Sequence, residues 1–180
     1  MDRSQQNRLV KQCLRQDRLA QRFLYEQYKD AMFTVAVRIT NDRDLAHDAL
    51  QEAFVNVFVH LQKFRGSGTL GSWIKTIVVR AALKEVAGLH LHANIEEEAD
   101  AHEVRFDEGL TGPLLHQLIG QLPDKSRVVF ALIEIEGYGH KEVAKMLNVS
   151  VGTTKSQLHY AKSILKQKLL KHGYEAQKKG

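Results

Sequence analysis

The chain has 180 residues, a net charge of +5 and a hydrophobic content of 43%. This length fits one medium or two small folded domains, and the hydrophobic content is ordinary for a soluble protein. The single cysteine, Cys13, excludes a disulfide framework and a thiolate metal site, and we expect it to be buried on an amphipathic helix. Without a signal segment or a spanning apolar run, the sequence predicts a cytoplasmic protein with no membrane insertion.

Charge is unevenly distributed along the chain. Lys and Arg outnumber Asp and Glu by 14 to 9 over residues 1–87 and by 11 to 5 over residues 113–180. Between these two blocks, residues 88–112 carry one basic and seven acidic residues and lose the helical period. The pattern predicts two basic domains joined by an acidic linker at 88–112, with a polyanionic partner for the domains.

The first block predicts a series of helices. Apolar residues at helical spacing indicate a helix over 4–15 and a second one capped by Asp17, which leads into the apolar segment 30–40. Asn41 and Asp42 interrupt the pattern, and a longer helix follows over 44–64. One side of that helix is wide and apolar. Its other side is a ridge of acidic and amide side chains without any Lys or Arg, which suits a protein partner with a basic surface: Asp44, Asp48, Gln51, Glu52 and Asn56.

A glycine-rich loop at 65–72 follows, and we expect Ser72 to cap a helix over 73–87. The loop lacks the glycine spacing and the preceding strand of a nucleotide-binding loop. Around it, cations and aromatic side chains are mixed, as suits unpaired nucleic acid: Lys63, Phe64, Arg65, Ser67, Thr69, Trp73, Lys75, Arg80 and Lys84. For Trp73 taken alone, the sequence favours a core anchor beside Ile74, Ile77 and Val78, with base stacking as the alternative.

The second block predicts a helix from Pro113, a break at Pro123, a helix over 128–135 and then a helix-turn-helix at 139–162. Asn148 can end the first of its helices in a left-handed conformation, Val149 can point back into the core, and Ser150 is a suitable N-cap for the next helix. The buried side of this second helix would carry Thr154, Leu158, Ala161 and Leu165. Short polar groups and cations remain for base edges and phosphates: Lys141, Ser150, Gly152, Thr153, Lys155, Ser156, Gln157, His159, Tyr160 and Lys162.

Two other functions compete with a factor that binds both protein and DNA, and a third alternative is that the chain is an inactive or partner-locked form of such a factor. The first is a transcriptional regulator with one helix-turn-helix that binds duplex DNA without docking on a polymerase. The second is a metal-dependent enzyme that uses His90 and His92 near Glu96–Glu98. The histidine spacing does not fit a helical zinc site, and no nucleophile–base pattern accompanies it. We therefore expect no enzyme activity, no metal and no cofactor.

Three segments in order resemble the extracytoplasmic-function (ECF) group of bacterial sigma factors. They are DALQEAF at 48–54, FRGSGTLGSWI at 64–74, and the pattern from Leu122 to Ser156 that includes the helix-turn-helix. The resemblance implies an all-α fold with two small helical domains joined by a flexible linker. It places sigma region two at 1–87, the acidic linker at 88–112 and sigma region four at 113–180.

The resemblance also implies a function, transcription initiation. Asp48, Gln51 and Glu52 would dock on core RNA polymerase, the loop at 64–72 and the helix at 73–84 would open the minus-ten element, and the helix at 151–162 would read the minus-thirty-five element. The implied partners are core RNA polymerase, promoter DNA as duplex and as melted single strand, and an anti-sigma factor.

The chain departs from the family pattern at several of these positions. Arg80 stands where Asn is frequent, while Lys84 and Ala87 replace an acid and an Arg. In the second domain, Gln157 and Tyr160 replace basic residues and Thr154 replaces Val. We expect weaker phosphate contacts from the recognition helix. We also expect this helix to pack less tightly on its unit, because the Thr154 hydroxyl takes the place of a methyl group.

Overall fold

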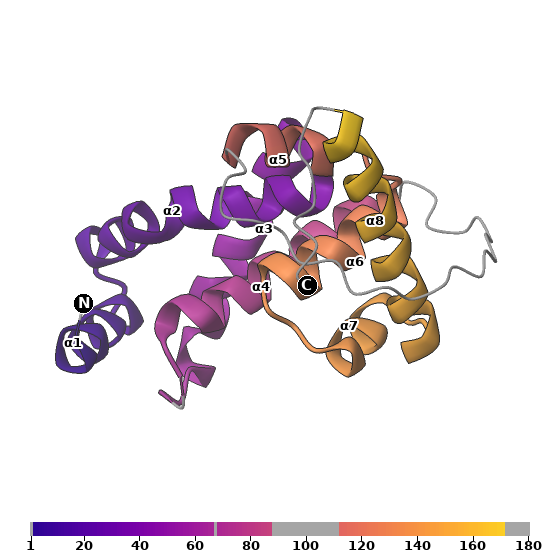
Figure 1. Ribbon diagram of the computed structural model, residues 1–180. Coiled ribbons are helices and arrows are strands. Elements are labelled where there is room, and N and C mark those ends of the chain that lie inside the picture. Colours follow the sequence, from indigo (N-terminus) through magenta and orange to yellow (C-terminus); the bar gives the residue numbers. More distant parts are fainter. Residues whose placement is uncertain (1, 67, 88–111, 172–180) are drawn as a thin grey trace. The chain divides into compact units, whose positions relative to one another are not determined.

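The computed structural model describes residues 2–66, 68–87 and 112–171, and all regular structure in these ranges is helical (Figure 1). The chain divides into two compact units, Met1–Leu89 and His90–Gly180. The predicted all-α class is therefore confirmed. Each unit is described below by itself.

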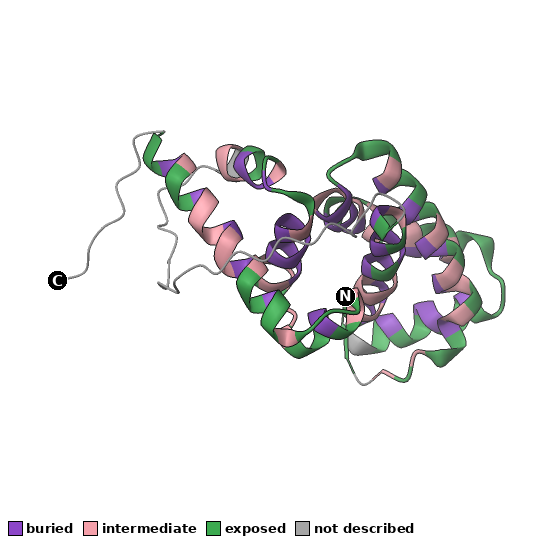
Figure 2. Cartoon of the chain, turned by 90° about the vertical axis from the view of Figure 1, so that its right-hand side faces the viewer, coloured by how far each residue is buried: buried purple, intermediate pink, exposed green. Residues whose placement is uncertain are grey.

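The first unit consists of α1 (Arg3–Leu14), α2 (Arg18–Thr40), α3 (Arg43–His60), the short 3-10 helix η1 (Leu61–Lys63) and α4 (Leu70–Ala87). Helices α2, α3 and α4 pack pairwise on one another, and α1 packs on α2 and η1. The buried positions of these helices, coloured purple in Figure 2, form the core, and Leu24, Ile39, Ile74 and Val78 are fully buried in it. Cys13 is buried on α1, as predicted.

Helix boundaries in this unit follow local capping chemistry. The Asp17 carboxylate accepts hydrogen bonds from the backbone N–H groups of Leu19 and Ala20, so α2 begins where predicted and continues without a break to Thr40. Asn41 then adopts a left-handed conformation (φ 56°, ψ 20°), and Asp42 caps α3. The α-helix ends at His60, and the predicted last turn is the 3-10 helix η1.

The prediction that Ser72 caps the fourth helix is wrong. Helix α4 begins at Leu70, and the Thr69 hydroxyl accepts a hydrogen bond from the Ser72 backbone N–H at 3.1 Å. Thr69 is thus the capping residue, because a hydroxyl at that place can reach an N–H three residues ahead. The earlier start puts Gly71 inside the helix against the Tyr28 ring, where a Cβ would lie 3.1 Å from a ring carbon.

The second unit consists of α5 (Gly112–Gly120), α6 (Asp124–Phe130), a π-helical turn (Ala131–Ile135), α7 (His140–Leu147) and α8 (Val151–Lys171). Helices α6 and α7 pack on α8, which spans the unit. The predicted helix over 128–135 is thus two segments, because the Glu136 N–H bonds to the carbonyl of Ala131, five residues back.

Candidate nucleic-acid and protein interfaces

The acidic ridge predicted on α3 divides into an exposed and a half-buried part. Asp44, Asp48 and Gln51 are exposed at i, i+4 and i+7, which places them in a line along one side of the helix. Glu52 and Asn56 lie beside this line and are half-buried. The Asn56 side-chain amide donates to the Glu52 backbone carbonyl at 3.0 Å, so it is already bound within the helix.

Glu52 forms an ion pair that joins two of the predicted sites. The Lys84 ammonium on α4 donates to both carboxylate oxygens of Glu52, each at 2.9 Å. This hydrogen bond, followed by the charge of Glu52, raises the pKa of Lys84. A residue assigned to polymerase binding and one assigned to the minus-ten element therefore neutralise each other at the boundary between α3 and α4.

An aromatic pair spans the loop before α4. The rings of Phe64 and Trp73 are 5.7 Å apart between centroids and tilted by 55°. Both side chains are half-buried, whereas Ile74 and Val78 on the same helix are fully buried. Trp73 thus packs on Phe64 and lies less deeply than its helical neighbours, and its ring remains partly accessible at the surface beside the loop.

Basic side chains surround this aromatic pair in the sequence. Lys63, Arg65 and Arg80 are exposed, Thr69 is exposed as well, and Lys75 is half-buried. Gly66 turns the loop with a φ of +70°, a conformation that glycine adopts at little cost. Ser67, which was also assigned to this site, lies outside the described residues.

Gln6 fixes the start of α4 and was not predicted. Its side-chain oxygen accepts a hydrogen bond from the Leu70 backbone N–H at 3.0 Å, across 64 positions of the chain, and both residues are buried. The sequence does place Gln6 on the same face of α1 as Leu9, Val10 and Cys13, which indicates that its side chain is buried. A polar residue on an apolar face requires a partner, but the sequence does not say which one.

The helix-turn-helix is formed by α7 and α8. Val143 and Ala144 are buried on α7, and Asn148 ends that helix in the left-handed region (φ 53°, ψ 47°). The Ser150 hydroxyl accepts a hydrogen bond from the Thr153 N–H at 2.9 Å, which confirms it as a cap. Thr154, Leu158, Ala161 and Leu165 are buried as predicted. The placement of Val149 in the core is wrong, since its side chain is 39% exposed.

The side of α8 that we assigned to DNA is exposed in the first turns of the helix. Further along, its side chains contact other residues of the same unit. The exposed positions are Lys141 on α7, Ser150, Gly152, Thr153, Lys155 and Ser156, while Gln157, His159, Tyr160 and Lys162 are half-buried. Gln157 accepts a hydrogen bond from the buried Ser126 hydroxyl at 2.7 Å. Lys162 forms an ion pair with Glu134 at 2.9 Å. These two side chains therefore already have partners inside the unit.

The Thr154 hydroxyl links the two helices of the motif. It is fully buried, donates to the Val151 carbonyl at 2.8 Å and lies 3.0 Å from His140 Nδ1. His140 is the first residue of α7, so this contact joins the beginnings of α7 and α8. The hydroxyl that departs from the family pattern is thus bonded in this structure.

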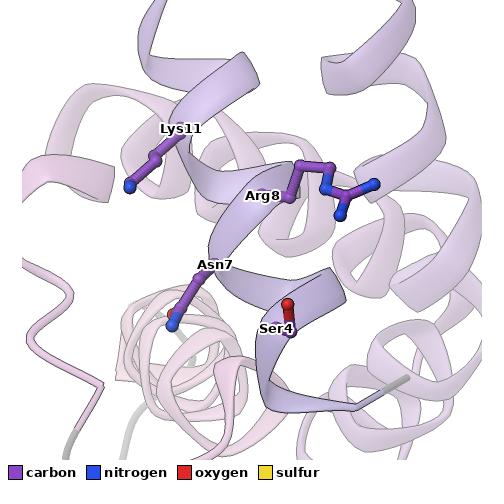
Figure 3. Close-up of a pocket in the computed structure, with 4 residues that line it drawn as sticks. All are labelled: Ser4, Asn7, Arg8 and Lys11. Atoms are coloured by element: carbon purple, nitrogen blue, oxygen red, sulfur yellow. The ribbon is translucent and has the colours of Figure 1, made fainter.

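The outer face of α1 carries a further polar group of residues. Ser4, Asn7, Arg8 and Lys11 border an open hollow of about 570 Å³ and extend from one side of the helix (Figure 3). In the ranges that the structure describes, no three His, Cys, Asp or Glu residues gather as a metal site would require. His90 and His92 lie outside these ranges. No described helix is long and apolar enough to cross a membrane.

Family models match both units of the chain. Residues 24–89 match sigma-70 region 2, and residues 114–165 match sigma-70 region 4. The chain is 25% identical to the RNA polymerase sigma-H factor of Pseudomonas aeruginosa, with 94% of this chain and 96% of that protein covered. It is 26% identical to the ECF sigma factor SigW of Bacillus subtilis, with 89% and 94% covered.

Two solved structures share the fold. The sigma factor RpoE of Bartonella quintana, determined with the anti-sigma factor NepR, has a TM-score of 0.54 and 19% identity, with 83% of this chain and 96% of that chain covered. CnrH, determined with the cytosolic domain of CnrY, has a TM-score of 0.52 and 20% identity, with 94% and 99% covered. The matches to sigma-70 region 2 and then region 4, together with relatives that cover about nine-tenths of the chain, show that this protein belongs to the ECF group of RNA polymerase sigma factors.

Proposed function

We propose that this sigma factor divides initiation among three surfaces and catalyses no reaction itself. The exposed line of Asp44, Asp48 and Gln51 on α3 docks on core RNA polymerase. The Phe64–Trp73 pair and the cations around it hold the opened minus-ten strand. The first turns of α8 read the minus-thirty-five duplex. In this proposal residues 1–87 act as region two, 88–112 as the linker and 113–180 as region four.

The observation that carries the proposal is the acidic line on α3. It is exposed, it contains no cation, and it lies in a unit with a net positive charge. Folding does not require it, because the core side of α3 is formed by other residues, among them Leu50, Phe54 and Val57. An acidic surface repels nucleic acid, so a protein partner with basic side chains explains it better than DNA does.

Physical chemistry separates the tasks of the two DNA surfaces. Opening a base pair costs a few kcal/mol, and stacking of the freed base on an aromatic ring can offset this cost. The Trp73 ring is partly exposed and can make that contact. In region four, Thr153, Lys155 and Ser156 are exposed for a duplex groove and its phosphates. Gln157 and Lys162 contribute less, because each would have to leave an internal partner.

We further propose an anti-sigma factor as a regulatory partner. Its support is that a structurally similar sigma factor, RpoE, was determined in a complex with the anti-sigma factor NepR, and that the similar CnrH was determined with the cytosolic domain of CnrY. An anti-sigma factor that masks the α3 line would prevent core binding. Two results would support this regulation: the chain copurifies with such a partner, and transcription by the chain and core polymerase begins when the partner is removed.

Run-off transcription with core polymerase and genomic promoter fragments tests the proposed function. We expect specific transcripts from the wild-type chain. Trp73→Ala should keep core binding but lose transcription from closed duplex, with recovery on templates whose minus-ten region is unpaired beforehand, while Trp73→Phe should retain most activity. A chain that binds duplex DNA alone and never supports initiation would instead be an ordinary helix-turn-helix regulator.

A further inference from the structure

The net positive charge of the first unit is concentrated at the beginning of the chain. Residues 1–25 carry six Lys or Arg and two Asp or Glu, a net charge of +4, whereas residues 26–87 carry eight and seven, a net charge of +1. The minus-ten loop therefore lies in a nearly neutral segment, because the acids of α3 offset its cations. A polyanionic partner of this unit is attracted most strongly to α1 and the start of α2.

The outer side of α1 presents this charge to solvent. Ser4, Asn7, Arg8 and Lys11 are exposed, follow the spacing i, i+3, i+4 and i+7, and extend from one side of the helix (Figure 3). We call these four residues the α1 face. Helix α1 contains no acidic residue. Neither Arg8 nor Lys11 forms an ion pair with any residue that the structure describes, so both cations are available to a partner.

The chemistry of the α1 face suits phosphate groups. The apolar residues Leu9, Val10 and Cys13 are buried on the other side of the helix. A helix that lies on a lipid surface needs its apolar side exposed, and α1 has already used that side in the core. The α1 face instead offers a hydroxyl, an amide and two cations, which are groups that contact the phosphates of a nucleic-acid backbone.

Helix α1 lies beside the loop that we assigned to the minus-ten element (Figure 1). It packs on η1, which ends directly before Phe64, and Gln6 accepts the hydrogen bond from the N–H of Leu70 at the other end of the loop. A strand held at this loop therefore passes close to α1. Upstream DNA leads to the minus-thirty-five element and so to the second unit, which leaves the downstream side of the strand for α1.

We propose that the α1 face binds the sugar-phosphate backbone of the opened promoter strand directly downstream of the minus-ten element. The inference rests on the proposed role of Phe64 and Trp73 and adds a second contact to the same strand. The face extends over about 10 Å from Ser4 to Lys11, at 1.5 Å of rise per residue. This length matches about three steps of a strand at 3.4 Å each. Contacts of this kind hold the strand in place without reading its bases.

The test measures how the affinity of the holoenzyme for promoter DNA depends on salt. The full chain, bound to core RNA polymerase, is titrated onto a promoter fragment that gives a run-off transcript and whose minus-ten region and adjoining downstream segment are unpaired beforehand. We expect R8Q/K11Q to bind about three- to tenfold more weakly, with a slope of log affinity against log salt that is about 1.4 less steep, or about 0.7 for each lost contact to a single strand. R8K/K11R keeps both charges and should bind like the wild type.

A shortened fragment that ends at the downstream edge of the minus-ten element should bind R8Q/K11Q and the wild type equally. The matched control is K166Q/K171Q, which removes the same charge from exposed positions near the end of α8. We expect its affinity and slope to stay at the wild-type values, and circular dichroism should show the same melting temperature for all variants, because these positions are exposed.

Three results would overturn the inference. They are a wild-type affinity and slope for R8Q/K11Q on the long fragment, an equal loss for K166Q/K171Q, and an equal loss for R8Q/K11Q on the shortened fragment. In each case the wild-type holoenzyme still transcribes, so the proposed function stands. If the wild-type holoenzyme gave no specific transcript from any promoter fragment, the proposed function itself would be contradicted.

Discussion

A single hydrogen bond ties the first helix of the chain to the loop proposed for promoter opening. The Leu70 N–H begins α4, and its acceptor is the Gln6 side chain rather than a neighbouring residue. Because both groups are buried, removal of the acceptor leaves the N–H without water or a protein partner. Gln6 thus supports the geometry of the loop from outside it.

Gln6→Met is expected to destabilise the first unit by about 1–3 kcal/mol, since it preserves the side-chain size but removes the acceptor. Gln6→Glu keeps an acceptor oxygen and should lose less. Urea unfolding followed by the fluorescence of Trp73, the only tryptophan in the chain, measures both. An unchanged unfolding midpoint for Gln6→Met would show that the Leu70 bond contributes nothing to stability.

Cys13 is the other residue of α1 whose environment has a measurable consequence. Burial, and then the charge of Asp17, raise the pKa of its thiol from 9.0 to about 11. The reactive thiolate is therefore scarce at neutral pH. We expect slow labelling by a thiol reagent at pH 8 in the folded protein and rapid labelling in urea, and a fast native reaction would contradict the burial of this thiol.

The same shift predicts how stability depends on pH in the alkaline range. The unfolded thiol loses its proton near pH 9, whereas the folded thiol keeps it until about pH 11. The unfolded state thus binds fewer protons in this window, so the contribution of Cys13 to stability falls as pH rises from about 9 to 11 and is constant below it. Cys13→Ala should reduce this decline.

At the scale of the elements, α8 serves two tasks at neighbouring positions. Its exposed first turns are available to DNA, while Gln157 holds the hydroxyl of Ser126, which is buried on α6. A role for Gln157 in base reading therefore competes with its role in packing. Gln157 replaces a basic residue of the family pattern, and in this structure its side chain instead accepts the hydrogen bond from Ser126.

Gln157→Ala should lower the stability of the second unit by about 1–3 kcal/mol, because the Ser126 hydroxyl then stays buried without its acceptor. Ser156→Ala, one residue away and exposed, should leave stability within about 0.5 kcal/mol and act only on duplex binding. Thermal unfolding by circular dichroism compares the two variants. Equal stability for both would show that the Ser126 bond is dispensable.

The sequence predicted elements best where the signal was local. Asp17, Asn41 and Ser150 set helix ends through their own side chains and neighbours, and all three act as expected. Ser72 was misjudged because Thr69 is an equally good cap and lies three residues earlier. Contacts between distant segments, such as Gln6 with Leu70 or Glu52 with Lys84, carry no local signal and needed the fold.

At the scale of the whole molecule, the chain combines two helical units that belong to sigma regions 2 and 4. The account assigns protein docking to one helix side of the first unit and DNA contacts to the loop beside α4 and to α8. The ion pair between Glu52 and Lys84 connects the docking helix with the opening helix. Its exposed position makes it a weak contributor to stability, so its main effect is on the charge each surface presents.

The most direct measurement of the central claim is the affinity of core RNA polymerase for two charge-reversed variants of the full chain. Asp48→Lys changes the exposed acidic line on α3, and Asp30→Lys makes the same change at an exposed position on α2. The account predicts that Asp48→Lys weakens binding by about a hundredfold or more and that Asp30→Lys changes it by less than about twofold, with both proteins folded. Equal affinities for the two variants would contradict docking through α3.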